Sequence, residues 1–394
     1  MTVVALSEHQ RLDRVPLSAE AGWALARSNL VSASPSRPAG TWQITAKDRV
    51  GAARIGPVEL RITPKLPLDR LFFLLGYQQH WDDWLPGPVE TRPVDGLVEA
   101  IARAFARQAD HALRQGPLRG YLRMDDALPT VRGRIRESVQ MRRRFGFPVP
   151  VEVSYHEFTL DTAENRLLLA AARRLLRLPG IPDGLRPALR RIPARLVGVS
   201  ALAPGRPLPA WPRNRLNERY HAALGLSELI LRDASPQPAD GAIQIDGFML
   251  DMDQVFESFV IQALSDALAV YRGHSRLQDT RHHLDADRVI QLRPDLVWDD
   301  AVGRPAAVAD AKYKLGERGR YPREDIYQML AYCTRLGLRH GHLVYAAGPA
   351  PRTARRIVNA QVEIFCHALD LTAAPSEILK QIASIAAVMV AEPA

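Results

Sequence analysis

The segment VADAKYK, residues 308–314, decides how the C-terminal third of this 394-residue chain is expected to fold. It is a mostly apolar run that predicts a β-strand. Side chains of a strand point alternately to its two faces, so Asp310 and Lys312 share one face while Ala311 and Tyr313 share the other. The strand therefore carries a carboxylate and a lysine side by side.

A second strand is predicted just upstream, in RPDLVWDD, residues 293–300. Asp295 enters this strand, and a turn joins it to the first one. The residues interpreted as belonging to that turn are Asp299, Asp300, Gly303 and Pro305. Hairpin pairing would bring Asp295 near Asp310 and Lys312, so two carboxylates and a lysine are expected to converge.

Such a group of side chains suits hydrolysis of a phosphodiester bond. Two carboxylates can hold Mg²⁺, for which Mn²⁺ can substitute, and the metal lowers the pKa of a bound water and neutralises charge on the phosphate. A lysine can orient that water or stabilise the transition state. The predicted catalytic residues are Asp295, Asp310, Lys312 and Glu257, and the predicted metal ligands are the three carboxylates among them.

Two predicted helices complete this arrangement. DQVFESFVIQALSDALAV, residues 253–270, is amphipathic and places Glu257 beside its buried stripe, within reach of the metal. EDIYQMLAYCTRLG, residues 324–337, places Gln328 and Tyr332 one turn apart on a common face, where both could border a DNA backbone. Each element alone has an ordinary structural explanation, but their order and spacing together favour a site.

Other candidate groups in the last third are weaker. His282 and His283 lie in a polar loop without a partner at metal-ligand spacing, and we expect them to be solvated. Cys333 is expected on the buried side of its helix, and no nearby histidine would make it a nucleophile.

The composition describes a folded protein with excess positive charge. Hydrophobic residues make up 47% and charged residues 24%, and the net charge is +9, which favours an anionic partner and nucleic acid first. Two cysteines fit a reducing cytoplasm. No signal peptide and no membrane-spanning apolar run are visible, so the chain is expected in the cytoplasm. Without a G-x-x-x-x-G-K-[ST] loop, we expect no nucleotide hydrolysis by that route.

The length predicts two or three domains and an α+β multidomain fold. Residues 1–90 are expected to be β-rich, because VELRI alternates apolar and charged residues between turn signals. Residues 91–240 are expected to be mostly helical, and 241–394 to form an α/β nuclease core. Proline-rich stretches at 203–212 and 233–241 interrupt the chain, and the second is the better candidate for a linker.

The middle region contains a basic segment, VRGRIRESVQMRRRFGF, residues 131–147. It suits either a phosphate-contacting surface or a solvated arginine-rich face, and the sequence does not separate the two. The predicted DNA-contacting residues are Gln328, Tyr332, Arg132, Arg134, Arg142, Arg143 and Arg144.

The motifs P-D at 294–295, D-A-K at 310–312 and Q-x-x-x-Y at 328–332 resemble those of the PD-(D/E)xK nuclease superfamily. More specifically, the chain resembles the McrC family, the nuclease subunits of McrBC-type modification-dependent restriction systems. Further segments follow in that family's order: IGPVELRITPKLP at 55–67, GPLRGYLRMDDALPTVRGRI at 116–135, YHEFTLDTAENRLL at 155–168 and VFESFV at 255–260.

This resemblance implies an Mg²⁺-dependent DNA endonuclease subunit of a type IV, modified-cytosine-dependent restriction complex that serves antiviral defence. It implies docking, through the β-rich N-terminal region, on a McrB-like AAA+ ring whose GTPase activity it stimulates, and cleavage of methylated double-stranded DNA in that complex. By the same resemblance, Asp295 and Asp310 are metal ligands and Lys312 is the catalytic lysine. Glu257 matches only the F-E part of its motif.

Two alternatives stay open at this point. One is a DNA repair or recombination nuclease of the same superfamily that acts without a GTPase ring. The other is a non-catalytic regulatory subunit, which the presence of Asp295, Asp310 and Lys312 disfavours. The modification recognised, and whether the partner uses GTP or ATP, are also open.

Overall fold

The computed structural model describes residues 2–77, 96–203, 205–232, 245–315, 321–347 and 352–391. Contacts between these residues define two compact units. The first takes residues 2–4, 51–60 and the described chain between 96 and 249, and the second takes residues 5–50, 61–77 and the described chain from 250 onward. The predicted domain boundaries after residues 90 and 240, and the predicted linker at 233–241, lie outside the described residues.

The N-terminal region is built mainly of strands. Its elements are β1 (Thr2–Ser7), β2 (Arg11–Pro16), α1 (Ala19–Arg27), β3 (Val31–Ser36), β4 (Thr41–Ala46), β5 (Arg49–Ile55), β6 (Val58–Thr63) and α2 (Leu68–Tyr77). Strands β2, β4 and β3 form one antiparallel sheet, and β1, β6, β5 and β10 (Ile245–Asp251) form another. The strand predicted at VELRI is confirmed as β6, and its Val58, Leu60 and Ile62 are buried.

The first unit contains a helical region. Its helices are α3 (Leu97–Leu113), α5 (Ala163–Leu175), α6 (Arg186–Arg195), η1 (Glu218–Tyr220) and α7 (His221–Arg232). The hydroxyl of Thr162 caps α5 by accepting a hydrogen bond from the backbone N–H of Asn165. Phe105, Leu168 and Leu224 are fully buried where these helices pack.

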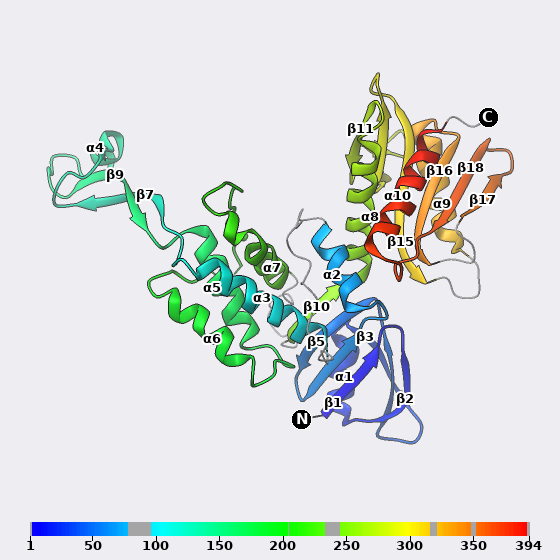
Figure 1. The fold of residues 1–394 in the computed structure, drawn as a ribbon, viewed down its shortest axis with the longest axis horizontal. Coiled ribbons are helices and arrows are strands. Elements are labelled where there is room, and N and C mark those ends of the chain that lie inside the picture. The colour runs from blue at the N-terminus through cyan, green and yellow to red at the C-terminus, as the bar shows by residue number, and fades with distance from the viewer. Residues whose placement is uncertain are drawn as a thin grey trace. The chain divides into compact units, whose positions relative to one another are not determined.

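An arm, residues 120–159, extends from this helical region (Figure 1). It consists of β7 (Gly120–Leu128), β8 (Arg134–Ile135), α4 (Glu137–Arg143) and β9 (Val151–Thr159), with the antiparallel sheet order β7-β9-β8. The arm has little core of its own, since α4 has no buried residue. Its exposed aromatic side chains are Tyr121, Phe145, Phe147 and Phe158.

The second unit is centred on a six-stranded sheet with the order β11-β14-β15-β16-β18-β17. These strands are β11 (Gly273–Leu277), β14 (Leu296–Asp300), β15 (Pro305–Leu315), β16 (His340–Ala347), β17 (Arg352–Ile357) and β18 (Val362–Ala368), and a small hairpin is formed by β12 (His282–His283) and β13 (Gln291–Leu292). The central pairs β15–β16 and β16–β18 are parallel, and the outer pairs are antiparallel.

Helices cover both faces of this sheet (Figure 1). Helix α9 (Arg323–Leu336) packs Met329, Tyr332 and Cys333 into a core with residues of β16 and β18. Helices α8 (Met252–Leu268) and α10 (Pro375–Val390) pack on each other and on β15. Cys333 is buried, as predicted. In the described part of the chain, no helix is both long and apolar enough to cross a membrane.

Candidate active site

The hairpin β14–β15 brings the first predicted carboxylate to the D-A-K segment. Its register pairs Leu296 with Ala309, so Asp295, one residue before β14, lies level with the middle of β15. The carboxylate of Asp295 accepts a hydrogen bond of 2.9 Å from the backbone N–H of Ala311 through Oδ2. Residues 16 positions apart in the chain are therefore in direct contact, as the spacing of the two strands predicts.

Asp310 and Lys312 occupy the same face of β15. The Nζ atom of Lys312 lies 2.5 Å from Oδ2 of Asp310, and Asp310 is only 2% exposed. Burial lowers the pKa of Lys312, but the charge of Asp310 and its hydrogen bond outweigh burial, so the pKa is raised overall. Lys312 is therefore a protonated cation beside the carboxylates at neutral pH.

The two carboxylates are held where ionisation is unfavourable. Burial and the negative charge of Asp310 raise the pKa of Asp295 to about 8, although the Ala311 N–H opposes this shift. Burial also raises the pKa of Asp310, against the opposing effect of Lys312. A further positive charge at this position would favour the ionised form of both groups. Asp295 and Asp310 are both buried and lie opposite each other on the hairpin, and carboxylate oxygens are the ligands that a hard divalent cation such as Mg²⁺ prefers.

Gln278 joins the third carboxylate to this pair, and the sequence analysis missed it. Its side-chain amide donates hydrogen bonds to Oε1 of Glu257 on α8 and, at 3.4 Å, to Oδ1 of Asp295. The residue follows β11, whose Leu277 pairs with Leu296, so position 278 lies opposite position 295. If residues 273–277 are predicted to be an edge strand that pairs with 296–300, Gln278 is expected next to Asp295.

Helix α9 places its two predicted site residues differently. Gln328 is exposed, and its amide donates a hydrogen bond of 2.8 Å to the hydroxyl of Tyr332. Tyr332 is buried, and its hydroxyl donates to the carbonyl of Arg293 at 3.1 Å. The predicted contact between Tyr332 and DNA is therefore corrected: the ring belongs to the core, and its hydroxyl supports Gln328 and the chain that leads to Asp295.

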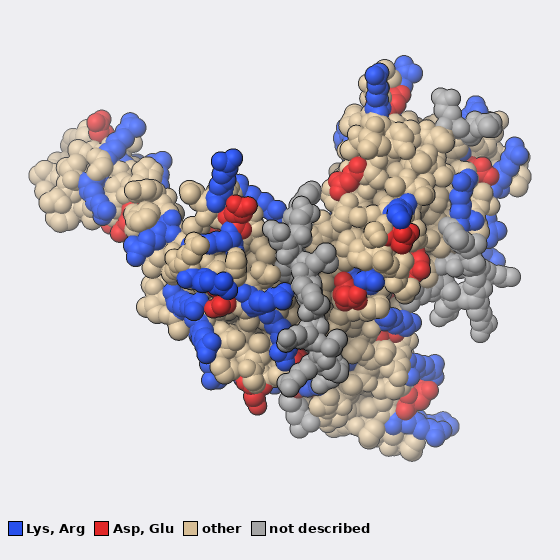
Figure 2. Space-filling view, viewed as in Figure 1, with Lys and Arg blue, Asp and Glu red and all other residues tan. Residues whose placement is uncertain are grey.

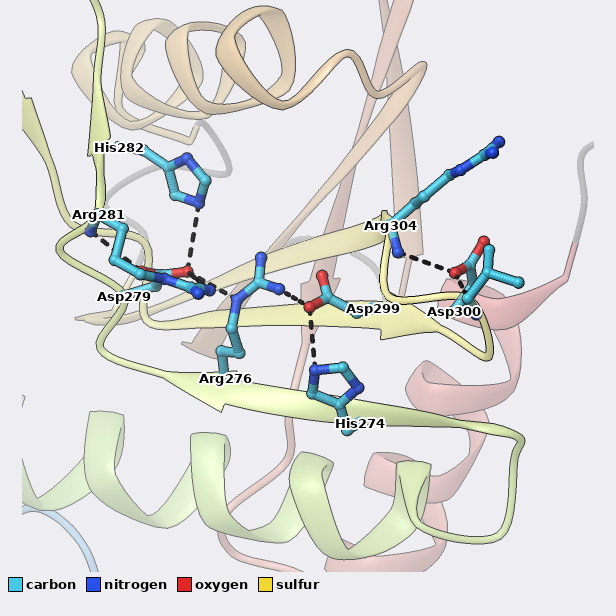
Figure 3. A network of polar contacts seen from close by, with 9 residues as sticks. His274, Arg276, Asp279, Arg281, His282, Asp299, Asp300 and Arg304 are labelled. Atoms are coloured by element: carbon cyan, nitrogen blue, oxygen red, sulfur yellow. Dashed lines mark hydrogen bonds and ion pairs between the residues drawn. The ribbon is translucent and has the colours of Figure 1, made fainter.

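A network of arginine, aspartate and histidine side chains joins β11, β14 and the segment that follows β11 (Figure 3). Asp299, interpreted from the sequence as a turn residue, is instead a buried residue of β14 that forms an ion pair with Arg276 and lies 3.2 Å from His274. Asp300 does act in the turn, because Oδ1 accepts the backbone N–H groups of Val302 and Arg304 at 2.9 Å each. Burial on both faces of the strand explains why Asp299 needs a cationic partner.

The same network corrects the expectation for His282. Its Nε2 lies 3.2 Å from Oδ2 of Asp279, and its side chain is largely buried rather than solvated. Asp279 also contacts Arg276 and Arg281, and hydrogen bonds from Arg281 hold the pKa of Asp279 well below its usual range. Because the N–H of Asp279 donates to the carbonyl of Pro294 at 3.1 Å, this network braces the backbone just before Asp295.

The predicted arginines belong to the arm, in the first unit, whereas the carboxylates belong to the second. The guanidinium of Arg132 lies 4.1 Å above the ring of Tyr155, and Arg144 forms a 3.2 Å ion pair with Glu152. The exposed members of the predicted set are Arg132, Arg134, Arg142 and Arg143. Lys and Arg side chains also recur on the visible face of the helical region (Figure 2).

The fold of the chain is similar to that of a chain in a solved structure. That structure is the refined half-complex of a tetradecameric assembly of Thermococcus gammatolerans McrB AAA+ hexamers with bound McrC. The match has a TM-score of 0.60 and 17% sequence identity, and it covers 97% of this chain and 99% of that chain. A chain of the cryo-EM structure of the Thermococcus gammatolerans McrBC complex has a TM-score of 0.40 and 21% identity, over 69% of this chain and 89% of that chain.

No curated protein matches the chain. A family model described as McrBC 5-methylcytosine restriction system component matches residues 44–346. That match covers well over half of the sequence and includes both strands of the carboxylate hairpin. The protein therefore belongs to the family of McrBC 5-methylcytosine restriction system components.

Proposed function

We propose that this chain is the Mg²⁺-dependent DNA endonuclease subunit of a McrBC-type restriction complex, with a PD-(D/E)xK nuclease core in its second unit. The observation that carries the proposal is the convergence of Asp295, Asp310 and Lys312 on the β14–β15 hairpin. The three side chains come from two strands, and a hydrolase acting on a phosphodiester needs both their charges and their proximity.

Asp295 and Asp310 would hold the metal ion, and Glu257 would add a third carboxylate through its link to Gln278. When bound, Mg²⁺ would supply a bound water of lowered pKa and a positive charge against the scissile phosphate. The raised pKa of Asp295 fits this role, because a cation at the site removes the unfavourable interaction between adjacent carboxylates.

The remaining groups bind, orient and stabilise. Lys312 presents a fixed positive charge, held by Asp310, toward negative charge that develops on the phosphate. The backbone N–H of Ala311 holds the carboxylate of Asp295 in one orientation. Gln328, exposed and supported by Tyr332, would donate a hydrogen bond to the DNA backbone near the metal.

The partner proposed for this subunit is a McrB-like AAA+ GTPase ring. Family membership and the fold shared with a chain from an assembly of McrB hexamers with bound McrC support this partner. The chain would dock through its β-rich N-terminal region and stimulate hydrolysis by the ring, since its own sequence has no G-x-x-x-x-G-K-[ST] loop. Double-stranded DNA with modified cytosine is the proposed substrate, and the exposed arginines of the arm are proposed contacts to its phosphates.

The test measures DNA cleavage and partner GTP hydrolysis for wild type and Asp310→Ala, each with Mg²⁺ and a McrB-like motor subunit. Loss of cleavage with stimulation retained is expected, because Asp310 lies in the carboxylate site. Asp287→Asn, at an exposed position, is the matched control. Cleavage that survives Asp310→Ala would exclude the site, and full cleavage without the motor would favour a repair nuclease that needs no GTPase ring.

A further inference from the structure

A second group of possible metal ligands lies in the N-terminal part of the second unit. Glu8 and His9 occupy the turn between β1 and β2, and Asp48 occupies the turn between β4 and β5. Nε2 of His9 lies 3.5 Å from Oε1 of Glu8 and 3.3 Å from Oδ1 of Asp48. One ligand atom from each residue lies within 4.8 Å of the other two, so the three donors converge on one point.

Two atoms of this group lack hydrogen-bond partners among the described residues. Oε1 of Glu8 and Nε2 of His9 are both inaccessible to solvent, and the Glu8 side chain as a whole is 0% exposed. Oε2 of Glu8 does have partners: it accepts the hydroxyl of Tyr313 at 3.2 Å and the backbone N–H of Lys65 at 3.3 Å. These two hydrogen bonds hold Glu8 so that its unpartnered oxygen is directed at His9.

A buried carboxylate oxygen and a buried ring nitrogen that make no hydrogen bond are costly, even when they lie near each other as these do. Burial raises the pKa of Glu8, although the Lys65 N–H and the charge on His9 oppose the shift. A protonated His9 between Glu8 and Asp48 would relieve part of this cost as an ion pair. A cation bound by all three residues would relieve it for both unpartnered atoms at once.

We propose that Glu8, His9 and Asp48 form a binding site for a divalent transition-metal cation of the Zn²⁺ type. The two separations measured from His9, 3.5 Å to Glu8 and 3.3 Å to Asp48, match this ion, because tetrahedral ligands at about 2.0–2.1 Å from Zn²⁺ lie about 3.4 Å from one another. An imidazole ligand favours Zn²⁺ and its neighbours over Mg²⁺ or Ca²⁺. The side chains of His9 and Asp48 are 33% and 40% exposed, so the group lies near the protein surface.

The site would tie the N-terminal turns to the elements that carry the candidate active site. Tyr313, which holds Glu8, is adjacent to Lys312 on β15 and directs its side chain to the opposite face. The carbonyl of Asp48 accepts the N–H of Met252 at 2.8 Å, at the first residue of α8, the helix that carries Glu257. A bound ion would therefore stabilise the positions of β15 and α8. The inference does not depend on the proposed nuclease function, because it uses different ligands.

The test is Zn²⁺ binding to the full chain by calorimetry, with excess Mg²⁺ present to occupy the carboxylates of the β14–β15 hairpin. His9→Asn is the sharpest variant, because the φ of 58° at His9 is one that asparagine tolerates, so the backbone is retained while the imidazole is lost. His156→Ala, at an exposed position of the arm, is the matched control.

Zn²⁺ binding should weaken by at least about tenfold in His9→Asn and Asp48→Asn and stay unchanged in His156→Ala. Added Zn²⁺ should also raise the midpoint of thermal unfolding of wild type but not of His9→Asn. If His9→Asn binds Zn²⁺ as tightly as wild type, or if wild type binds no Zn²⁺, the three residues form an ion pair only. Asp310→Asn should bind Zn²⁺ as wild type does, because Asp310 is not a ligand of this site. Loss of the proposed nuclease site can therefore be distinguished from loss of the Zn²⁺ site.

Discussion

Gln278 holds Asp295 by two separate hydrogen bonds. Its backbone N–H donates to the carbonyl of Asp295 at 2.8 Å, and its side-chain amide donates to Oδ1 of the same residue at 3.4 Å. The φ of 51° at Gln278 lies in the left-handed region, which non-glycine residues seldom adopt. The chain thus turns sharply at this position and directs the amide toward both Asp295 and Glu257.

We predict that Gln278→Asn raises the Mg²⁺ concentration that cleavage requires while leaving the fold intact. Asparagine tolerates the left-handed backbone but is one methylene shorter, so it cannot bridge the two carboxylates. Loss of a residue that orients metal ligands costs about 10–100-fold in metal affinity or activity. The measurement is the cleavage rate as a function of Mg²⁺ concentration in the complex with the motor subunit. Gln291→Ala, at an exposed position, is the control, and an unchanged Mg²⁺ requirement would contradict a positioning role.

We predict that Lys312→Met lowers the single-turnover cleavage rate by about 100-fold or more, since removing one stabilising group from a developing charge costs roughly 10²–10³ in rate. Methionine preserves the aliphatic stem but removes the charge beside Asp310. Because the pKa of Lys312 is raised, wild type should not lose the lysine charge as pH rises from neutral toward the ordinary lysine range. Lys380→Met, at a well-exposed position, should retain the wild-type rate. A near-normal rate for Lys312→Met would remove Lys312 from the mechanism.

A prediction of pH-dependent stability concerns Asp161, which lies just before α5. Hydrogen bonds from Arg166 lower the pKa of Asp161 to about 2, with help from Ser200. Because this folded-state pKa lies below the unfolded value, the stabilisation is present above about pH 4 and is lost as pH falls toward about 2. Asp161→Asn should therefore reduce the free energy of unfolding near neutral pH by on the order of 1–2 kcal/mol, allowing for solvent screening.

Urea unfolding of wild type and Asp161→Asn across this pH range would measure the effect. The difference between the two proteins should shrink as pH falls. Asp183→Asn, whose side chain is fully exposed, is the control and should show little difference at any pH. If the difference in the free energy of unfolding between wild type and Asp161→Asn does not change with pH, the charge of Asp161 does not contribute to stability.

Gly341 tests the packing of α9 on the sheet. A Cβ atom at this position of β16 would overlap the side chains of Met329 and Cys333, both buried on α9. We predict that Gly341→Ala destabilises the protein by about 1–3 kcal/mol, the usual cost of overpacking a core. The same displacement should lower cleavage, because α9 carries Gln328 and Tyr332. Gly184→Ala, where a Cβ meets nothing within 4 Å, should be nearly neutral in the same unfolding measurement.

The local elements and the pair of strands at the site can be predicted from the sequence. Alternation along β15 predicts that Asp310 and Lys312 share a face, and the short connection to β14 predicts that Asp295 joins them. Helical periodicity likewise predicts α8 and α9. These features depend on neighbours within about 17 positions, whose relative placement follows from strand and helix geometry alone.

Which of the remaining polar residues reach the site depends on the packing of distant segments. Gln278 reaches Glu257 because β11 forms the edge of the sheet beside β14, and Tyr313 reaches Glu8 across 305 positions of sequence. Asp299 and Tyr332 are buried because the sheet is covered on both faces, which their local sequence does not reveal. Local periodicity predicts which side chains share a face of an element. The residues that contact them on that face depend on how distant segments of the chain pack.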